Sequence, residues 1–326
     1  MLIEVEGVTK EFKVYQRTKG FAAGLGSFFH RPYEIKKAVD DISFQVQKGE
    51  TVAYIGANGA GKSTTIKILA GILVPTSGRV SIDGRVPYQE RRENALHIGV
   101  VFGQRTHLHW DLPVIDSYEL YQKMYRISPD RYRRNLETFS ELLDLGQFIR
   151  KPVRQLSLGQ KMRAELAAAL LHEPELVYLD EPTIGLDVLA KSKIRGFIKQ
   201  INRELRTTVI LTTHDMDDIE QICGRLIMID GGKILYDGSL AGFKERFGGE
   251  HLLVVDFADE QVTVDDPRLK LVKVEGPRRT FRFRREEITV AEAITLIARN
   301  YDITDLNIKE PEIEGIVKKI YENKRL

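Results

Sequence analysis

One glycine-containing segment constrains the fold of this chain more than any other feature. A short apolar run at residues 51–55 precedes it, and apolar residues at helical spacing follow it as far as Gly71. The segment consists of Gly56, Ala57, Asn58, Gly59, Ala60, Gly61, Lys62 and Ser63, with Thr64 next. This order of strand, glycine-rich loop and helix fits the phosphate-loop motif. Because such short apolar runs are typical of buried parallel strands, the sequence predicts an α/β fold.

The residue types of this loop indicate its chemistry. Glycines allow consecutive backbone N–H groups to converge on phosphate oxygens, and the following helix N-terminus adds a partial positive charge. Lys62 is then placed to bridge the β- and γ-phosphates, and the Ser63 hydroxyl to hold Mg²⁺. An ordinary glycine turn is the alternative, which the flanking strand and helix disfavour. We therefore expect ATP and Mg²⁺ as cofactors.

Two carboxylates follow a second apolar run, residues 176–179. Asp180 and Glu181 come at its C-terminal end, where α/β proteins place their ligand chemistry. We expect Asp180 to bind Mg²⁺, directly or through water, and Glu181 to be the base that polarises the attacking water. Taken alone, the pair fits equally well two acidic residues that open a loop before Pro182.

Residues 156–160 form a third motif with two compatible interpretations. Ser157 and Gln160 have the spacing of a capping box, which predicts a helix that starts here and continues through Leu171. A serine hydroxyl and backbone N–H groups at a helix N-terminus also suit the binding of a γ-phosphate.

Together these motifs resemble those of ATP-binding cassette (ABC) proteins, in which a Leu-Ser-x-Gly-Gln signature precedes the strand that ends in two carboxylates. Leu156, Ser157, Gly159 and Gln160 carry this resemblance, although Leu158 replaces the usual middle glycine. The resemblance covers residues of about 1–245. It implies a RecA-like P-loop domain with a helical subdomain at about 105–170, and a homodimer that sandwiches ATP between its protomers.

Three further positions extend the resemblance. Gln104 matches the glutamine that reaches Mg²⁺ and the attacking water, Asp187 matches the aspartate of the D-loop, and His214 matches the histidine that contacts the γ-phosphate. In isolation, Gln104 and His214 are more typical of polar loop residues. The resemblance assigns catalysis to Lys62, Gln104, Glu181 and His214. It assigns the metal to Ser63, Gln104 and Asp180, and contact with nucleotide to Ser157, Gly159, Gln160 and Asp187.

An aromatic side chain near the N-terminus is expected to stack on adenine. Phe12 is the natural match, but Tyr15 is close to it in sequence. An insertion follows at about residues 17–37, rich in glycine and aromatic residues and with basic flanks. It can change the direction in which either ring points. Both therefore remain candidates.

The composition beyond residue 245 changes to that of a separate module. Three segments that resemble strands and two that resemble helices, between residues 246 and 326, predict a small accessory α+β domain. Within this domain, residues 278–285 interleave arginine and phenylalanine, a pattern that is also found in RNA-binding segments. Period-2 alternation favours a strand with Phe281 and Phe283 on one face and with Arg282 and Arg284 pointing to water. With 49 basic and 47 acidic residues, we expect no nucleic acid partner.

The combination of the insertion, residues 101–105 and the appended module is most similar to ATPase subunits of daunorubicin- and viologen-type exporters. Their permeases are separate integral-membrane chains, which implies a peripheral position on the cytoplasmic face of the cell membrane. A single cysteine, Cys223, suits that reducing compartment. A soluble non-transport ABC ATPase and a catalytically silent regulatory cassette are the alternatives.

The surface that meets the permease is expected to include the insertion and a hydrophobic groove in the helical subdomain. Its candidates follow Gln104 closely in the sequence, and ordinary helical core is an equal alternative for much of the set. They are Trp110, Leu112, Tyr118, Leu120, Tyr121, Met124 and Tyr125.

Overall fold

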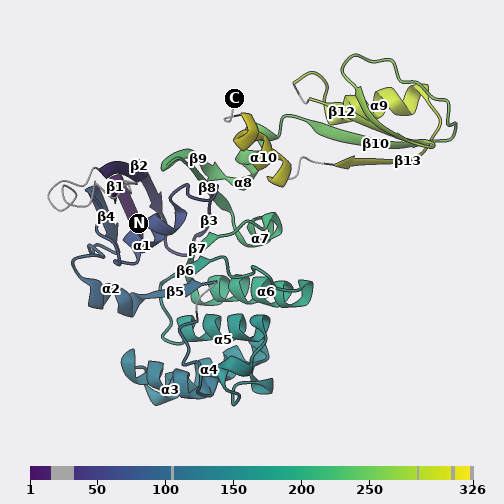
Figure 1. Cartoon of the computed structure of the whole chain (residues 1–326). Helices are drawn as coiled ribbons and strands as arrows, with labels where there is room; N and C mark the ends of the chain where they lie inside the picture. The colour runs from purple at the N-terminus through teal and green to yellow at the C-terminus, as the bar shows by residue number, and fades with distance from the viewer. Residues whose placement is uncertain (16–32, 104–105, 285, 310–312, 324–326) are drawn as a thin grey trace, which may run out of the picture. The chain divides into compact units, whose positions relative to one another are not determined.

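The computed structural model describes residues 1–15, 33–103, 106–284, 286–309 and 313–323 (Figure 1). The chain divides into two compact units, residues 1–238 and 239–326. This division precedes the boundary expected at residue 245, because helix α8 (Leu240–Gly248) packs against α10 (Ile313–Asn323) in the second unit. Most of the insertion expected at residues 17–37 lies outside the described residues.

The first unit is built on a central six-stranded sheet. Its strands, in spatial order, are β5 (Ile98–Phe102), β6 (Leu176–Asp180), β7 (Thr208–Thr212), β3 (Thr51–Gly56), β8 (Arg225–Asp230) and β9 (Lys233–Ser239). The pairs from β5 through β8 are parallel. The C-terminal ends of β6, β7 and β3 therefore meet at one edge of the sheet, which is where α/β folds place ligands.

A second, antiparallel sheet completes the core of this unit. It consists of β2 (Tyr33–Val46), β1 (Ile3–Tyr15) and β4 (Ser77–Ile82), in that order. Its buried side chains and those of α1 (Lys62–Leu69) pack with residues of the central sheet in one hydrophobic cluster. The predicted α/β fold class is confirmed.

Helices make up most of the region between β5 and β6. α3 (Val114–Met124), α4 (Pro129–Leu143) and α5 (Leu158–Leu170) lie together at the bottom of the view in Figure 1. Ser128 caps the start of α4 by accepting from Arg131 N at 3.4 Å. Pro129 then occupies the first helical turn, where its missing N–H costs nothing.

Three further α-helices lie in the described part of the first unit. They are α2 (Arg91–His97), α6 (Val188–Leu205) and α7 (Met216–Ile222), with short 3₁₀ turns at Leu145–Gln147 and Val153–Gln155. None of the helices in the described ranges is long and apolar enough to cross a membrane.

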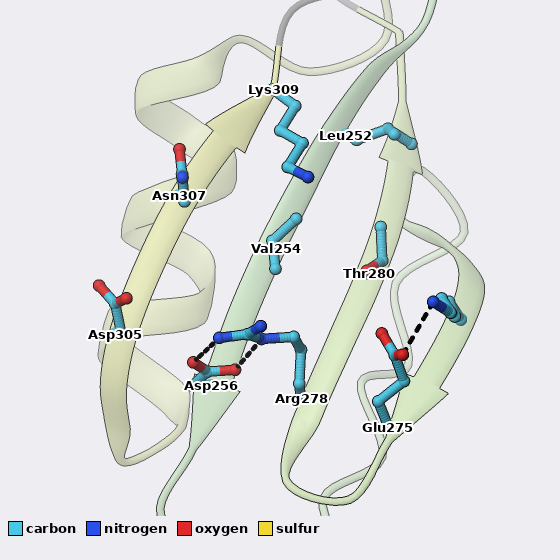
Figure 2. Close-up of a pocket in the computed structure, with 10 residues that line it drawn as sticks. Leu252, Val254, Asp256, Glu275, Arg278, Thr280, Asp305, Asn307 and Lys309 are labelled. Carbon is cyan, nitrogen blue, oxygen red and sulfur yellow. Dashed lines mark hydrogen bonds and ion pairs between the residues drawn. The ribbon is translucent and has the colours of Figure 1, made fainter.

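The second unit contains a four-stranded antiparallel sheet with one buried face. The strands are ordered β11 (Lys270–Glu275), β12 (Arg278–Phe283), β10 (His251–Phe257) and β13 (Ile303–Lys309). Phe281 and Phe283 lie in the core with residues of α9 (Val290–Asn300), whereas Arg282 and Arg284 are exposed, so the predicted alternation is confirmed. The other face forms a shallow polar pocket of about 410 Å³, where Arg278 donates two hydrogen bonds of 2.6 Å to Asp256 (Figure 2).

Candidate functional site

The phosphate loop runs from the end of β3 to the start of α1. Gly61 precedes the helix at a φ of 111°, which favours glycine, and a Cβ there would lie 2.3 Å from the carbonyl oxygen of Ala38. No side chain in the described part of the chain caps α1, so its first N–H groups remain available to an anion. Gly59 also has a positive φ, of 82°. Ala57, Asn58, Ala60, Ser63 and Thr64 occupy the loop and the first helical turn, as the motif predicts.

Lys62 folds back over this loop. Its Nζ donates to the carbonyl oxygens of Gly56 at 2.5 Å and Ala57 at 3.3 Å, and the side chain is buried. Burial lowers the pKa of Lys62, while the nearby carboxylates of Glu181 and Asp180 act in the opposite direction. The structure therefore brings the lysine of the loop close to both carboxylates that follow β6.

Asp180 and Glu181 are held by the neighbouring strand β7. The Thr212 hydroxyl donates to Asp180 Oδ1, and the backbone N–H of Glu181 donates to the Thr212 carbonyl oxygen at 2.9 Å. Glu181 has a φ of 56°, an uncommon conformation for a residue with a side chain. This sharp turn directs the carboxylate of Glu181 toward the segment that follows β7.

His214, two residues after the end of β7, contacts Glu181 twice. His214 Nε2 lies 3.3 Å from Glu181 Oε1, and the backbone N–H of His214 donates to Oε2 at 3.3 Å. Burial raises the pKa of Glu181, while His214 and Lys62 act to lower it. The sequence placed Glu181 and His214 in one site, but their direct contact is a finding of the structure.

The signature motif begins α5 as a capping box. Ser157 Oγ accepts from Gln160 N at 3.2 Å, and Gln160 Oε1 accepts from Ser157 N at 3.0 Å, so the predicted capping box is confirmed. Within the described ranges, Ser157 and Gly159 make no hydrogen bond or ion pair with the phosphate loop of their own chain. Asp187 caps α6 by accepting from Ala190 N at 2.8 Å, and Gly159 lies beside Ala190.

The roles of three predicted site residues, near the adenine and at the attacking water, stay predictions. Gln104 lies outside the described residues. Phe12 and Tyr15 are both partly exposed on β1, where Lys10 Nζ lies 5.3 Å from the Phe12 ring centroid and Tyr15 stacks edge-on with Tyr33. The identity of the adenine-stacking residue stays a prediction.

A pocket of about 480 Å³ lies between the strand end of β5, the start of α5 and the loop before α6. Its walls include Phe102, Trp110, Leu158, Met162 and Ile184. Of the groove residues expected from the sequence, Trp110 lines this pocket, whereas Leu112, Leu120 and Met124 are exposed elsewhere on the helical subdomain.

Tyr118 belongs to the core instead. It is fully buried and donates its hydroxyl to the Ala164 carbonyl oxygen at 2.9 Å. Tyr121 donates to the His107 carbonyl oxygen at 2.7 Å, and Tyr125 stacks on His172 with ring centroids 4.0 Å apart. For these tyrosines the structure favours helical packing over a groove.

Sequence reasoning missed the buried acids that hold the site's loops. Glu165 Oε1 on α5 accepts from the Thr106 hydroxyl and from His107 N at 2.8 Å, just after Gln104 in the chain. Asp218 on α7 binds residues beside Glu181 and His214. The sequence carried a signal for Glu165, which stands alone as an acidic residue within the apolar run at residues 164–171. An acidic side chain is rarely buried without a partner, so its position indicates a buried interaction.

The residues present fit a nucleotide with its metal. The N-terminus of the helix is uncapped, the lysine amine is buried, and the loop has glycines where a Cβ would clash with the surrounding protein. Together these groups form a cradle for phosphate oxygens. The Ser63 hydroxyl and the Asp180 carboxylate are oxygen ligands of the kind that Mg²⁺ prefers. The fold and this site define a P-loop ATPase.

Known proteins extend this assignment. The family model described as ABC transporter matches residues 39–184. The ABC transporter ATP-binding protein NatA of Bacillus subtilis is 31% identical over 224 residues, which are 69% of this chain and 91% of NatA. The daunorubicin resistance ATP-binding protein DrrA3 of Streptomyces coeruleorubidus is 33% identical over 223 residues, 68% of this chain and 70% of DrrA3. The linearmycin resistance ATP-binding protein LnrL of Bacillus subtilis is 29% identical over 301 residues, 88% of this chain and 94% of LnrL.

A solved structure shows the same fold. The dimeric post-hydrolysis state of the ATP-binding cassette MJ0796, bound to ADP and Pi, aligns with a TM-score of 0.61 at 27% identity and covers 73% of this chain and 99% of that cassette. The present chain therefore belongs to the ABC transporter family, as an ATP-binding subunit with ATPase activity.

Proposed function

We propose that the chain is the ATP-hydrolysing subunit of an exporter, working as a homodimer with two ATP molecules between its protomers. The observation that carries this proposal is the meeting of Lys62, Glu181 and His214 beside the phosphate loop. Dimeric relatives such as MJ0796 support the assembly. DrrA3 and LnrL, named for resistance to daunorubicin and linearmycin, support export as the direction.

The site residues divide the reaction between them. Lys62 and the N-terminus of α1 bind the phosphates, while Ser157 and Gly159 of the partner protomer close the site from the other side. Glu181 accepts a proton from water as the water oxygen bonds to the γ-phosphorus and the bond to ADP breaks. Ser63, Asp180 and Gln104 would hold Mg²⁺, which would supply positive charge to offset that of the phosphates. His214 orients Glu181 and senses the γ-phosphate.

We further propose that a separate integral-membrane permease binds the first unit on the cytoplasmic face of the membrane. The pocket beside Trp110 and the insertion at about residues 17–37 are the candidate contacts. Trp110 is half-exposed, and Lys161 Nζ lies 4.3 Å from its ring centroid, so this wall presents an aromatic and cationic surface. Residues 246–326 are proposed as an accessory domain.

Replacing Glu181 tests the assignment directly. Glu181→Gln keeps the shape and the contacts of the side chain but removes the base, so we expect ATP binding to persist and turnover to fall by about a thousandfold. ATP should then accumulate in a closed dimer, visible by size-exclusion chromatography with Mg²⁺ and ATP.

Glu245→Gln, a substitution outside the site, is the matched control and should hydrolyse ATP at the parental rate. Parental turnover by Glu181→Gln, or a monomer with ATP bound, contradicts the proposal. A parent that binds ATP without hydrolysing it favours the regulatory-cassette alternative.

A further inference from the structure

Asp218 on α7 has a fully buried carboxylate, with an exposed fraction of 0%. A buried carboxylate is tolerated only where donors satisfy its oxygens. Asp218 Oδ2 accepts from the hydroxyls of Thr183 and Thr213, the latter at 3.1 Å, and Oδ1 accepts from Arg195 Nε at 2.5 Å. Three segments of the chain therefore meet at one side chain.

These three segments carry the groups proposed for hydrolysis. Thr183 lies two positions after Glu181 in the loop that follows β6, and Thr213 immediately precedes His214. The loops that bear the base and the histidine are thus pinned to a single carboxylate. The 3.3 Å contacts between Glu181 and His214 depend on the distance between these loops.

The third segment, α6, adds a second tether. Arg195 Nη2 also donates to Asp215 Oδ1 at 3.1 Å, and Lys191 Nζ donates to Asp215 Oδ2 at 2.5 Å. Asp215 directly follows His214, so His214 has a fixed neighbour on each side. Since α6 begins at the Asp187 cap, these cations also connect the D-loop to His214.

We propose that Asp218 is a positioning residue for ATP hydrolysis. It fixes the loops of Glu181 and His214 relative to each other and links them to α6 through Arg195. The inference rests on the proposed function. Asp218 touches neither substrate nor reacting atoms, so its effect passes through Thr183, Thr213 and Arg195. A buried ionic network of this kind specifies geometry more than it adds stability.

Asp218→Asn is the informative substitution. The amide has the size of the carboxylate but brings N–H donors toward the donors of Thr183, Thr213 or Arg195, and it leaves Arg195 without its buried counter-charge. We expect kcat for ATP hydrolysis to fall by about ten- to a hundredfold. The Kd for a fluorescent ATP analogue should change by less than about threefold, because the phosphate loop is untouched.

Asp237→Asn is the matched control. Asp237 binds Arg225 with Nε–Oδ1 at 2.7 Å and Nη2–Oδ2 at 2.8 Å, in an ion pair between β8 and β9 of the same unit. Asp237→Asn likewise takes one carboxylate from an arginine that keeps a second, since Arg225 retains Glu50 as Arg195 retains Asp215. Asp237 contacts neither catalytic loop. Thr213→Val removes one donor to Asp218 and the acceptor of the Asp215 N–H without a change of charge, so it should lower kcat in the same direction. Its effect should combine non-additively with that of Asp218→Asn.

A second readout does not depend on hydrolysis. Amide hydrogen exchange reports the protection of His214 N, which donates to Glu181 Oε2. We expect Asp218→Asn to increase exchange in residues 212–216 and Asp237→Asn to leave it unchanged. This measurement keeps its meaning even if the parent proves inactive, which would count against the proposed function alone.

Three outcomes overturn the proposal. These are a parental kcat in folded Asp218→Asn, equal losses of kcat in Asp218→Asn and Asp237→Asn, or unchanged exchange at residues 212–216. Recovery of most of the lost kcat by Asp218→Glu, which restores the charge, supports it.

Discussion

At the scale of single residues, His172 is the clearest case of a side chain whose ionisation is set by packing. Its ring is buried against Tyr125, and Nε2 lies 3.1 Å from the Ile98 carbonyl oxygen. Among the residues that the structure describes, Nδ1 has no hydrogen-bond partner. Burial lowers the pKa of His172 from 6.5 to about 4, because the charged ring would lose its hydration.

This shift predicts acid destabilisation over a defined range. The unfolded chain protonates His172 below pH 6.5, whereas the folded chain keeps it neutral until about pH 4. The stabilisation is therefore complete above pH 6.5 and is lost as the pH falls toward 4, by up to about 3 kcal/mol. His172→Phe keeps an aromatic ring and should remove this loss, measured by urea unfolding between pH 4 and 8. The exposed His109→Gln is the control, and equal pH dependence in His172→Phe and the parent contradicts the assignment.

Side chains whose ionisation depends on packing, such as His172, could not be predicted from the sequence. Lys62, Asp180, Glu181 and His214 were identifiable because each lies in a motif whose spacing carries the chemistry. His172 and Asp218 were not, since their environments come from Tyr125, Thr183 and Arg195, which are distant in the chain. The acidic run at residues 215–218 looks solvated in the sequence, although Asp218 is buried.

At the scale of elements, local signals predicted helix starts well and irregular strands poorly. The spacing of Ser157 and Gln160 located the start of α5, because the capping box is local. The sequence did not predict strand β13, because the pairing of this strand with β10 shifts register between Asp256 and Phe257. Such an irregularity breaks the alternation on which a strand prediction depends.

Glu165 shows how one element fixes another. Its carboxylate on α5 holds residues 106–108, and the contact with His107 raises the pKa of that imidazole. Glu165→Gln removes the charge and brings an amide toward N–H donors, so we expect a loss of about 1–3 kcal/mol of unfolding free energy. The pKa of His107 should fall, as measured by NMR titration. The exposed Glu141→Gln is the control, and an unchanged His107 titration in Glu165→Gln contradicts this role.

At the scale of the whole molecule, a complete ATP site is expected to need two chains. The phosphate loop lies at the end of β3, whereas the signature lies at the start of α5, beyond the helical region that begins at α3. The related cassette MJ0796 is a dimer in two solved structures. The sequence predicted this requirement through resemblance alone, because no local pattern encodes the partner's position.

Mixing two inactive variants tests the shared site. A Lys62→Ala chain paired with a Ser157→Arg chain places both defects in one composite site and leaves the other site intact. Half of the dimers in an equimolar mixture are mixed, so hydrolysis should recover to about a quarter of the parental rate if the sites act independently. Lys62→Ala mixed with Glu181→Gln is the matched control, because each composite site then carries one defect and no activity should return. Equal rates in the two mixtures, together with no ATP-dependent dimer in the first, would show that each chain completes its own site.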